Sequence, residues 1–377
     1  MRMETREELK NACRIVVKIG TSTLTHATGK LNLYRIERLV RELADLANEG
    51  REIILVTSGA VGAGIDRMGL AEKPKSIPEK QALAAVGQGI LMHIYEKLFA
   101  EYGQTVAQVL LTKENSVRHK QYMNSRNALL TLLKMGIIPI INENDAIAVD
   151  ELKIGDNDTL SATVATIVDA DALVILSDIE GVYTANPQTD ENAQLLTTIA
   201  EITPEVEKMA GGAGSKLGTG GMHTKIQAAK IAVNSGVTMV IASGARDGVV
   251  RSVLYGEPIG TLFPAKESHL KVRKSWLAFG RSIVGDLVVD AGCAAAMLRE
   301  GSSLLAAGIV EIHGKFSAGN TVRVLAPGGR EIARGIVNYD EHSLTKIIGR
   351  QTCEFSDILM GPIHKEVIHR DNMVLMV

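Results

Sequence analysis

The chain has 377 residues, and a single hydrophobic core stops growing near roughly 250–300 residues, so two domains are expected. Hydrophobic residues make up 46% and charged residues 22%, which excludes a mainly disordered protein. The 41 basic and 43 acidic side chains nearly cancel, which excludes an overall field that draws the chain to nucleic acid or to an anionic membrane.

The N-terminus and the cysteines bear on the cell compartment. Residues 1–10 alternate charges without an apolar core of signal-peptide length, and no stretch approaches the ~18 apolar residues of a membrane span. Cys13, Cys293 and Cys353 lie far apart and form no Cys-x-x-Cys pair, so neither a disulfide framework nor a zinc ribbon is indicated. We therefore expect a cytoplasmic protein that is neither exported nor inserted in a membrane.

From Ile15 to about Leu262, short apolar runs rich in β-branched residues alternate with longer amphipathic stretches. This alternation is typical of βα units, and wholly apolar runs are typical of strands covered by helices on both faces. The expected strands are 15–19, 53–57, 105–111, 137–141, 172–177 and 237–242, and the expected helices are 31–48, 77–99 and 123–135. The pattern predicts an α/β fold with a mainly parallel central sheet between helices.

Beyond these units the pattern changes. A polar, basic stretch that contains Pro264 reads as a linker, and short alternating runs with a turn signal at Pro327-Gly328-Gly329 follow it. These features indicate a small β-rich second domain. The expected division is a first domain over residues 1–262, a linker over 263–275 and a second domain over 276–377.

Glycine and polar residues follow several of the expected strands. Neither a P-loop nor a Gly-x-Gly-x-x-Gly after a strand is present, and ligands of open α/β sheets bind beyond the carboxyl ends of the strands. Glycines there let backbone N–H groups approach anionic oxygens. The segments are Lys18–Ser22, Thr57–Gly64, Asn142–Asp145, Gly155–Asp158, Ser177–Asp178 and Gly218–Lys225. This edge of the sheet therefore favours phosphate or carboxylate.

Two of these segments have a plain alternative reading. Lys18 ends an otherwise apolar strand, where a partly buried lysine needs an anionic partner, unless its ammonium group reaches water from the strand end. The segment Gly218–Lys225 could equally be an ordinary flexible surface loop.

Three carboxylates lie close together after the fourth strand. Asp145, Asp156 and Asp158 fall within fourteen positions and fit ammonium binding, organisation of a lysine or help with a hydrated Mg²⁺. The alternative is a solvated acidic loop in which Asp156 or Asn157 caps a helix that begins near Thr159.

The histidines indicate neither a catalytic base nor a metal site. His93 and His223 stand alone, and the first lies in an amphipathic stretch. His313, His364 and His369 lack metal-ligand spacing. We therefore assign no protein-held metal and no histidine base.

Six segments, taken together and in this order, resemble the amino acid kinase family. They are IVVKIGTSTLT (15–25), IILVTSGAVGAG (53–64), PIINENDAIA (139–148), IGDNDTLSA (154–162), ILSDIEGVYTANP (175–187) and GTGGMHTKIQAA (218–229). The segment 285–325 looks like a PUA domain, a small β-barrel first known from RNA-modifying enzymes. The resemblance implies a three-layer αβα sandwich followed by a PUA domain. It also implies ATP-dependent phosphorylation of the γ-carboxylate of L-glutamate, the first step of proline biosynthesis.

The resemblance further implies roles for individual residues. Lys18 and Lys225 would contact the transferring phosphoryl group from opposite sides, and Asp158 would hold both lysines. The substrate would be bound by Ser58, Gly59, Asn142, Asp145, Asp156 and Asn157, with Asp145 on the α-ammonium group. ATP would be bound by Lys18, Gly20, Ser177, Asp178, Thr219, Gly220, Gly221, Met222, His223, Thr224 and Lys225. Mg²⁺ would bridge the nucleotide phosphates with few direct protein ligands.

Two segments depart from the family pattern. Ser177 stands where the family more often has threonine, which keeps the hydroxyl group. The stretch RHKQYMNSRN (118–127) differs more, although Asn124 and Arg126 are retained, and this leaves the contacts of the substrate loop open.

Two other readings compete with glutamate phosphorylation. The first is a family member that acts on acetylglutamate, aspartate or uridylate. Asp145 argues against acetylglutamate, because a free α-amino group needs an anionic partner whereas an acetylated one does not, and an aspartokinase would more often carry ACT-type regulatory domains. The second is an RNA-binding protein. Residues 276–377 hold ten basic and eleven acidic side chains, so the PUA-like end lacks a basic footprint and RNA binding is not expected. The family resemblance also implies a homo-oligomer, dimeric or tetrameric, with proline as a feedback inhibitor.

Overall fold

The computed structural model separates the chain into two compact units, Met1–Ser268 and His269–Val377. The residues it describes are 5–26, 28–70, 74, 76–112, 119–147, 157–187, 189–210, 221–266, 283–350, 354–355, 358–359 and 364–376. Most of the expected linker, from residue 267 to 275, lies outside this described part.

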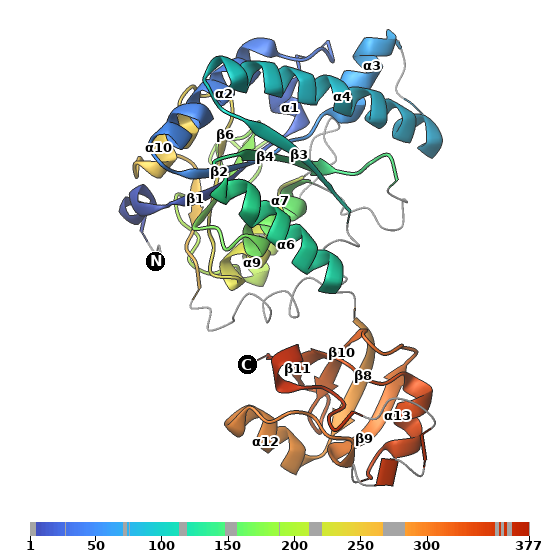
Figure 1. Cartoon of the computed structure of the whole chain (residues 1–377). Coiled ribbons are helices and arrows are strands. Elements are labelled where there is room, and N and C mark those ends of the chain that lie inside the picture. Colours follow the sequence, from blue (N-terminus) through green and yellow to red (C-terminus); the bar gives the residue numbers. More distant parts are fainter. Residues whose placement is uncertain are drawn as a thin grey trace. The chain divides into compact units, whose positions relative to one another are not determined.

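The first unit is built on a seven-stranded sheet in the order β3-β4-β2-β1-β5-β6-β7 (Figure 1). The strands are β1 (Arg14–Ile19), β2 (Glu52–Val56), β3 (Val106–Leu111), β4 (Ile138–Glu143), β5 (Ala172–Ser177), β6 (Thr238–Ser243) and β7 (Thr261–Phe263). All neighbours are parallel except β6 and β7. The six expected strands are confirmed to within two residues at each end. The antiparallel edge strand β7 was not expected, and its fully buried Phe263 lies inside the first unit.

Helices cover both faces of this sheet (Figure 1). They are α1 (Thr21–Leu24), α2 (Leu33–Asn48), α3 (Ala60–Met68), α4 (Ile77–Glu101), α6 (His119–Lys134), α7 (Asn157–Ile167), α8 (Pro204–Ala210), α9 (Met222–Asn234) and α10 (Val249–Leu254), with a 3₁₀ turn at Glu7–Asn11. Helices α2, α3, α4 and α10 form one layer, whereas α6, α7 and α9 form the other. This is the expected three-layer αβα arrangement.

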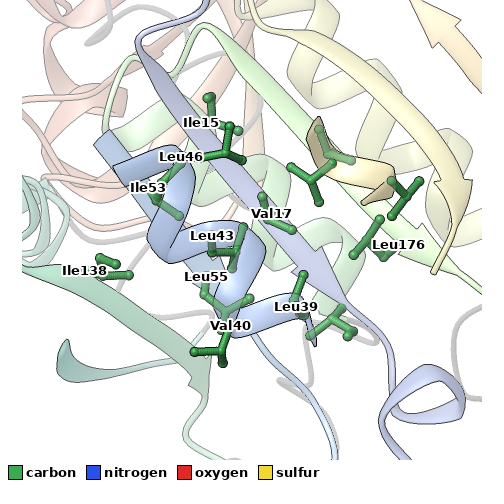
Figure 2. Packing of buried hydrophobic residues seen from close by; sticks show 14 of the residues in the cluster. Ile15, Val17, Leu39, Val40, Leu43, Leu46, Ile53, Leu55, Ile138 and Leu176 are labelled. Atoms are coloured by element: carbon green, nitrogen blue, oxygen red, sulfur yellow. The ribbon is translucent and has the colours of Figure 1, made fainter. Parts of the chain in front are cut away.

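The core under α2 shows why this layer is stable. The buried side chains of α2 recur three and four residues apart, and they pack on alternate residues of the central strands (Figure 2). Burying one such leucine or isoleucine stabilises the fold by about 1.5–3 kcal/mol. At the start of the helix, Asn32 accepts a hydrogen bond from the backbone N–H of Arg35. The sheet is therefore a rigid platform for the residues at its strand ends.

Helices α3 and α4 approach each other at backbone distance. A Cβ atom on Gly87 would lie 1.7 Å from the carbonyl oxygen of Ala60, and one on Gly64 would lie 2.1 Å from that of Leu83. Only glycine fits at these two positions. The sequence grouped Gly62 and Gly64 with a polar and glycine-rich strand end, whereas both lie inside α3. The role of Gly64 is close helix packing, and together with the contact of Gly87 it fixes α4 against the first turns of α3.

The second unit contains a five-stranded sheet in the order β12-β11-β10-β8-β9. Its elements are β8 (Ile283–Val289), α12 (Ala291–Glu300), β9 (Ile309–Gly314), β10 (Thr321–Leu325), β11 (Glu331–Ile336), α13 (Glu341–Ile347) and β12 (Met373–Leu375), with 3₁₀ turns at Ala306–Gly308 and Arg370–Asn372. Strands β8 and β10 are parallel, and the other pairs are antiparallel. A separate core of buried side chains fills this unit, which confirms the expected β-rich domain. Across the described residues of both units, no helix is long and apolar enough to cross a membrane.

Candidate active site

The candidate site lies at the carboxyl ends of the parallel strands and faces the layer of α7 and α9. Side chains alternate along a strand, and Ile15, Val17 and Ile19 of β1 belong to the core on the α2 side. Lys18 therefore points to the opposite layer, where α7 packs on both β1 and α9. Helix α7 carries Asp158 in its first turn, and α9 carries Lys225.

These three side chains form a buried lysine–aspartate–lysine cluster, made of Lys18, Asp158 and Lys225. Lys18 Nζ lies 2.5 Å from Asp158 Oδ1, and Lys225 Nζ lies 3.1 Å from Asp158 Oδ2. Asp158 is fully buried, and the two lysines are only 4% and 6% exposed. Two ammonium groups from different elements thus converge on one carboxylate away from water, and their positive charge suits an anionic ligand. The reading in which Lys18 reaches water is wrong.

Hydrogen bonds hold Asp158 in this position. Thr224 Oγ1 lies 3.0 Å from Asp158 Oδ2 and 2.7 Å from the carbonyl oxygen of Gly221. The hydroxyl of Ser161 donates to the backbone oxygen of Asp158 at 2.6 Å. The solvated acidic loop considered above does not describe Asp158, because this carboxylate is buried. Asp156 lies outside the described residues.

Four of the six residues expected to bind the substrate gather beside this cluster: Ser58, Gly59, Asn142 and Asn157. Asn157 Nδ2 lies 2.9 Å from the carbonyl oxygen of Thr57, 2.7 Å from Ser58 Oγ and 3.1 Å from Asn142 Oδ1. Gly59 follows Ser58 and immediately precedes α3, and its φ of 95° is a conformation that favours glycine. The helix α7 starts at Asn157 itself, so this residue does not precede the helix as a cap for a start near Thr159.

Asp145 is the next expected substrate residue along this strand end. It lies in the turn after β4 and is partly buried. The structure thus brings together Ser58, Gly59, Asn142 and Asn157, and it places Asp145 three residues beyond Asn142 on the same strand end.

Helix α4 supplies two polar contacts that sequence reasoning missed. Gln88 Oε1 accepts a hydrogen bond from Asn142 Nδ2 at 2.8 Å, and the hydroxyl groups of Tyr95 and Thr57 lie 2.8 Å apart. Burial raises the pKa of Tyr95 to about 12. Gln88 and Tyr95 are seven residues apart and share one buried face of α4. The sequence offered one signal for Gln88: a glutamine on the expected buried face of a mostly apolar helix needs a polar partner.

The expected nucleotide residues lie on the neighbouring strand ends. A Cβ atom on Gly20 would lie 3.5 Å from Lys18 Nζ, and Ser177 Oγ donates to Asp178 Oδ1 at 3.1 Å. Helix α9 begins with Met222, with Gly221 before it, and the side chain of His223 is exposed. The glycine-rich stretch expected to complete this site, which includes Thr219 and Gly220, lies outside the described residues.

Arg126 has a structural role that its sequence context did not reveal. Its guanidinium group donates to the carbonyl oxygen of Ile167 and pairs with Asp169, at the end of α7. It therefore stabilises the carboxyl end of the helix whose first turn carries Asp158. In the described part of the chain, no group of three or more His, Cys, Asp or Glu residues could hold a metal ion.

Comparison with known proteins gives two matching family models and several curated relatives. The amino acid kinase family matches residues 14–243, and the PUA domain matches residues 285–359. A glutamate 5-kinase of Moorella thermoacetica is 53% identical over 99% of both chains. A glutamate 5-kinase of Caldanaerobacter subterraneus subsp. tengcongensis is 53% identical over 96% of this chain and 98% of its own. One from Carboxydothermus hydrogenoformans is 51% identical over 98% of this chain and 99% of its own.

Proposed function

Because the chain belongs to the amino acid kinase family, we propose that it transfers the γ-phosphoryl group of ATP to the γ-carboxylate of L-glutamate. The products are L-glutamyl 5-phosphate and ADP, and the reaction is the first step of proline biosynthesis from glutamate. The relatives that carry this activity in their names match nearly the whole chain, PUA domain included. In the structure, the buried lysine–aspartate–lysine cluster is the observation that carries the proposal.

The cluster supplies what phosphoryl transfer needs from the protein. In the transition state the transferred group carries negative charge on its equatorial oxygens, and catalysis consists of positioning and of charge stabilisation. Lys18 and Lys225 come from different elements and are held on opposite oxygens of one carboxylate. We propose that their ammonium groups contact the phosphoryl group from two sides, while Asp158 acts as the positioning residue for both.

The nucleophile does not require a general base. A glutamate carboxylate has a pKa near ~4.3, so it is already ionised at neutral pH. The remaining task is to align two anions for in-line attack and to offset their repulsion. Two ammonium groups held out of solvent serve this purpose.

The group beside the cluster is proposed to bind glutamate. Ser58, Gly59 and Asn157 form a compact polar corner at the ends of β2 and α7, which supports contacts with the substrate's carboxylates. Asp145 offers a negative charge for the α-ammonium group. Gly20, Ser177 and the start of α9 would then take the nucleotide on the other side of Lys18.

A kinase that uses ATP also requires a divalent metal ion, and we propose Mg²⁺. The buried carboxylate of Asp158 already contacts two ammonium groups, so it is a poor metal ligand. Phosphate oxygens of the nucleotide are the hard ligands that Mg²⁺ prefers, together with water. The residues of the site fit an ion that arrives with ATP, where it would neutralise charge on the phosphates.

Other expectations about the molecule remain proposals that rest on the family. They are a cytoplasmic location, a homo-oligomeric state as dimer or tetramer, and feedback inhibition by proline. RNA binding by the PUA domain is not proposed, because residues 276–377 hold ten basic against eleven acidic side chains.

A substrate panel tests the activity. Purified protein with ATP and Mg²⁺ is assayed for ADP release with L-glutamate, N-acetylglutamate, L-aspartate and UMP, each with and without proline. We expect kcat/KM for L-glutamate to exceed that for N-acetylglutamate and UMP by at least about 100-fold, because a site built for a free ammonium group rejects acceptors that lack it. L-Aspartate keeps this group but is one methylene shorter, so we expect kcat/KM for it to be lower by at least about tenfold. A preference for any other acceptor would refute the proposal.

Asn in place of Asp145 tests the ammonium contact. Loss of the negative charge removes a charge-assisted hydrogen bond, so Asp145→Asn should raise KM for glutamate by roughly 10- to 100-fold and leave KM for ATP within about twofold. Asp66→Asn, an exposed carboxylate on α3, is the control for the change in charge. An effect confined to KM for ATP would move Asp145 to the nucleotide side.

A further inference from the structure

We propose that Gln88 is a positioning residue for the glutamate site: its side-chain oxygen fixes the orientation of the Asn142 carboxamide and, through it, that of Asn157. The inference rests on the proposed function and extends it to a residue of α4, a helix that contributes nothing to the lysine–aspartate–lysine cluster. Four side chains form the chain of contacts, which we call the amide relay: Gln88, Asn142, Asn157 and Ser58.

Backbone groups determine which way each amide of the relay points. The backbone N–H of Glu143 can only donate, and it lies 2.9 Å from Asn142 Oδ1. The oxygen end of the Asn142 amide must therefore face Glu143, and its amino end faces Gln88 at 2.8 Å. Gln88 in turn must present its oxygen, since two amino groups would repel each other.

A second backbone group settles Asn157 in the same way. The carbonyl oxygen of Thr57 can only accept, and it lies 2.9 Å from Asn157 Nδ2. The same nitrogen lies 3.1 Å from Asn142 Oδ1 and 2.7 Å from Ser58 Oγ. The orientation of the Asn157 amide thus depends partly on the oxygen that Asn142 presents.

Close packing holds the first member of the relay in place. Gln88 is 8% exposed and follows Gly87, where an added Cβ atom would lie 1.7 Å from the carbonyl oxygen of Ala60. Ala60 is the first residue of α3 and follows Gly59, which belongs to the polar corner formed with Ser58 and Asn157. The position of Gln88 relative to this corner is therefore set by backbone contact rather than by flexible side chains.

The relay is open at both ends. Gln88 Nε2 and Asn157 Oδ1 are buried, and neither has a hydrogen-bond partner within the described part of the chain. Buried polar atoms in folded proteins nearly always have partners. A relay that ends in one unsatisfied donor and one unsatisfied acceptor is typical of a binding site that a ligand completes, and not of a closed structural network.

This arrangement predicts a selective defect when the Gln88 oxygen is removed. The Asn142 amide then loses the acceptor for its amino group. The orientations of the Asn142 and Asn157 amides are therefore less well fixed. The lysine–aspartate–lysine cluster is assembled from β1, α7 and α9 and keeps its contacts. Glutamate binding should therefore weaken while ATP binding does not.

The test is a double-mutant cycle on the full chain. Gln88→Met removes the polar group and keeps the length of the side chain, and it should raise KM for glutamate by about tenfold with KM for ATP within twofold. Asn142→Ala should raise KM for glutamate as well. In the Asn142→Ala background, Gln88→Met should add less than about twofold, because both changes break one relay. Leu91→Val, a buried change about one turn from Gln88 that leaves every amide of the relay in place, is the packing control.

The outcomes separate the inference from the proposed function. Additive effects on KM, an unchanged KM in Gln88→Met, or an equal rise in KM for ATP would each overturn the role of Gln88. A shift in KM with Leu91→Val as large as that of Gln88→Met would also overturn it, since packing alone would then explain the defect. Wild-type protein that fails to phosphorylate glutamate would refute the proposed function itself. The activity of the wild-type protein is therefore measured before any variant is compared with it.

Discussion

Replacement of Lys225 by methionine is expected to lower kcat with ATP and glutamate by about 100- to 1,000-fold, and Lys18→Met by a similar factor. Each change removes one preorganised positive group from the transferring phosphoryl group, and loss of one such donor typically lowers kcat by this amount. Methionine keeps the apolar stem of the lysine, so packing around α9 and β1 is largely preserved. Steady-state ADP release measures kcat, and circular dichroism measures the folded state.

The same helix offers a matched control. Lys230 of α9 also forms an ion pair, with Glu207 at 2.5 Å, but its side chain is 31% exposed and lies outside the site. Lys230→Met should therefore keep wild-type turnover. Turnover within about threefold of wild type in Lys18→Met or Lys225→Met would remove that lysine from the proposed mechanism.

Asp158→Asn should damage stability as well as activity. The variant leaves two buried ammonium groups without the carboxylate that they share, and breaking a buried ion pair destabilises a protein by about 3–5 kcal/mol. For a unit of this size, that loss lowers Tm by roughly 10 °C. We expect kcat to fall by at least about 100-fold, since neither lysine is then held in place. Thermal unfolding and ADP release measure the two effects.

A double variant separates these effects of Asp158. In Lys18→Met/Asp158→Asn only one buried ammonium group remains, so the repulsion between like charges is gone and part of the lost Tm should return. Activity should not return, because both the carboxylate and one lysine are missing. Asp190→Asn, at an exposed carboxylate, is the control for the change of residue type. A wild-type Tm in Asp158→Asn would contradict the buried cluster.

The central strands could be predicted because their physical signal is local. Each parallel strand is covered on both faces, so nearly every side chain must be apolar, and runs such as residues 172–177 stand out in the sequence. The strand β7 could not be found in this way. It has three residues, lies at the sheet edge and pairs with β6, so its only signal is a contact with a distant segment.

Helix α3 was missed for a different reason. Glycine disfavours a helix interior by about 1 kcal/mol relative to alanine, so Gly62 and Gly64 argue locally for a loop. The tertiary contact of Gly64 with Leu83 outweighs this preference. Local propensity and packing disagree here, and packing determines the structure.

The site was only partly accessible from the sequence. Lys18 was conspicuous because a charge ended an apolar strand, and the family resemblance linked it to Lys225 and Asp158. Gln88 carried neither of these signals. Its partner Asn142 is 54 residues away, and only the fold brings the two amides together. Polar side chains that act through one another leave little trace in a single sequence.

The position of β1 in the sheet also has a consequence for synthesis of the chain. This strand is made first but lies between β2 and β5, so one of its edges stays unpaired until residues 172–177 have left the ribosome. Lys225 follows Lys18 by some two hundred residues, which at about 5–20 residues per second corresponds to roughly 10–40 s. Throughout this interval the nascent chain holds Lys18 without Lys225, and for most of it without Asp158 as well. The lysine–aspartate–lysine cluster is therefore among the last features of the first unit to form.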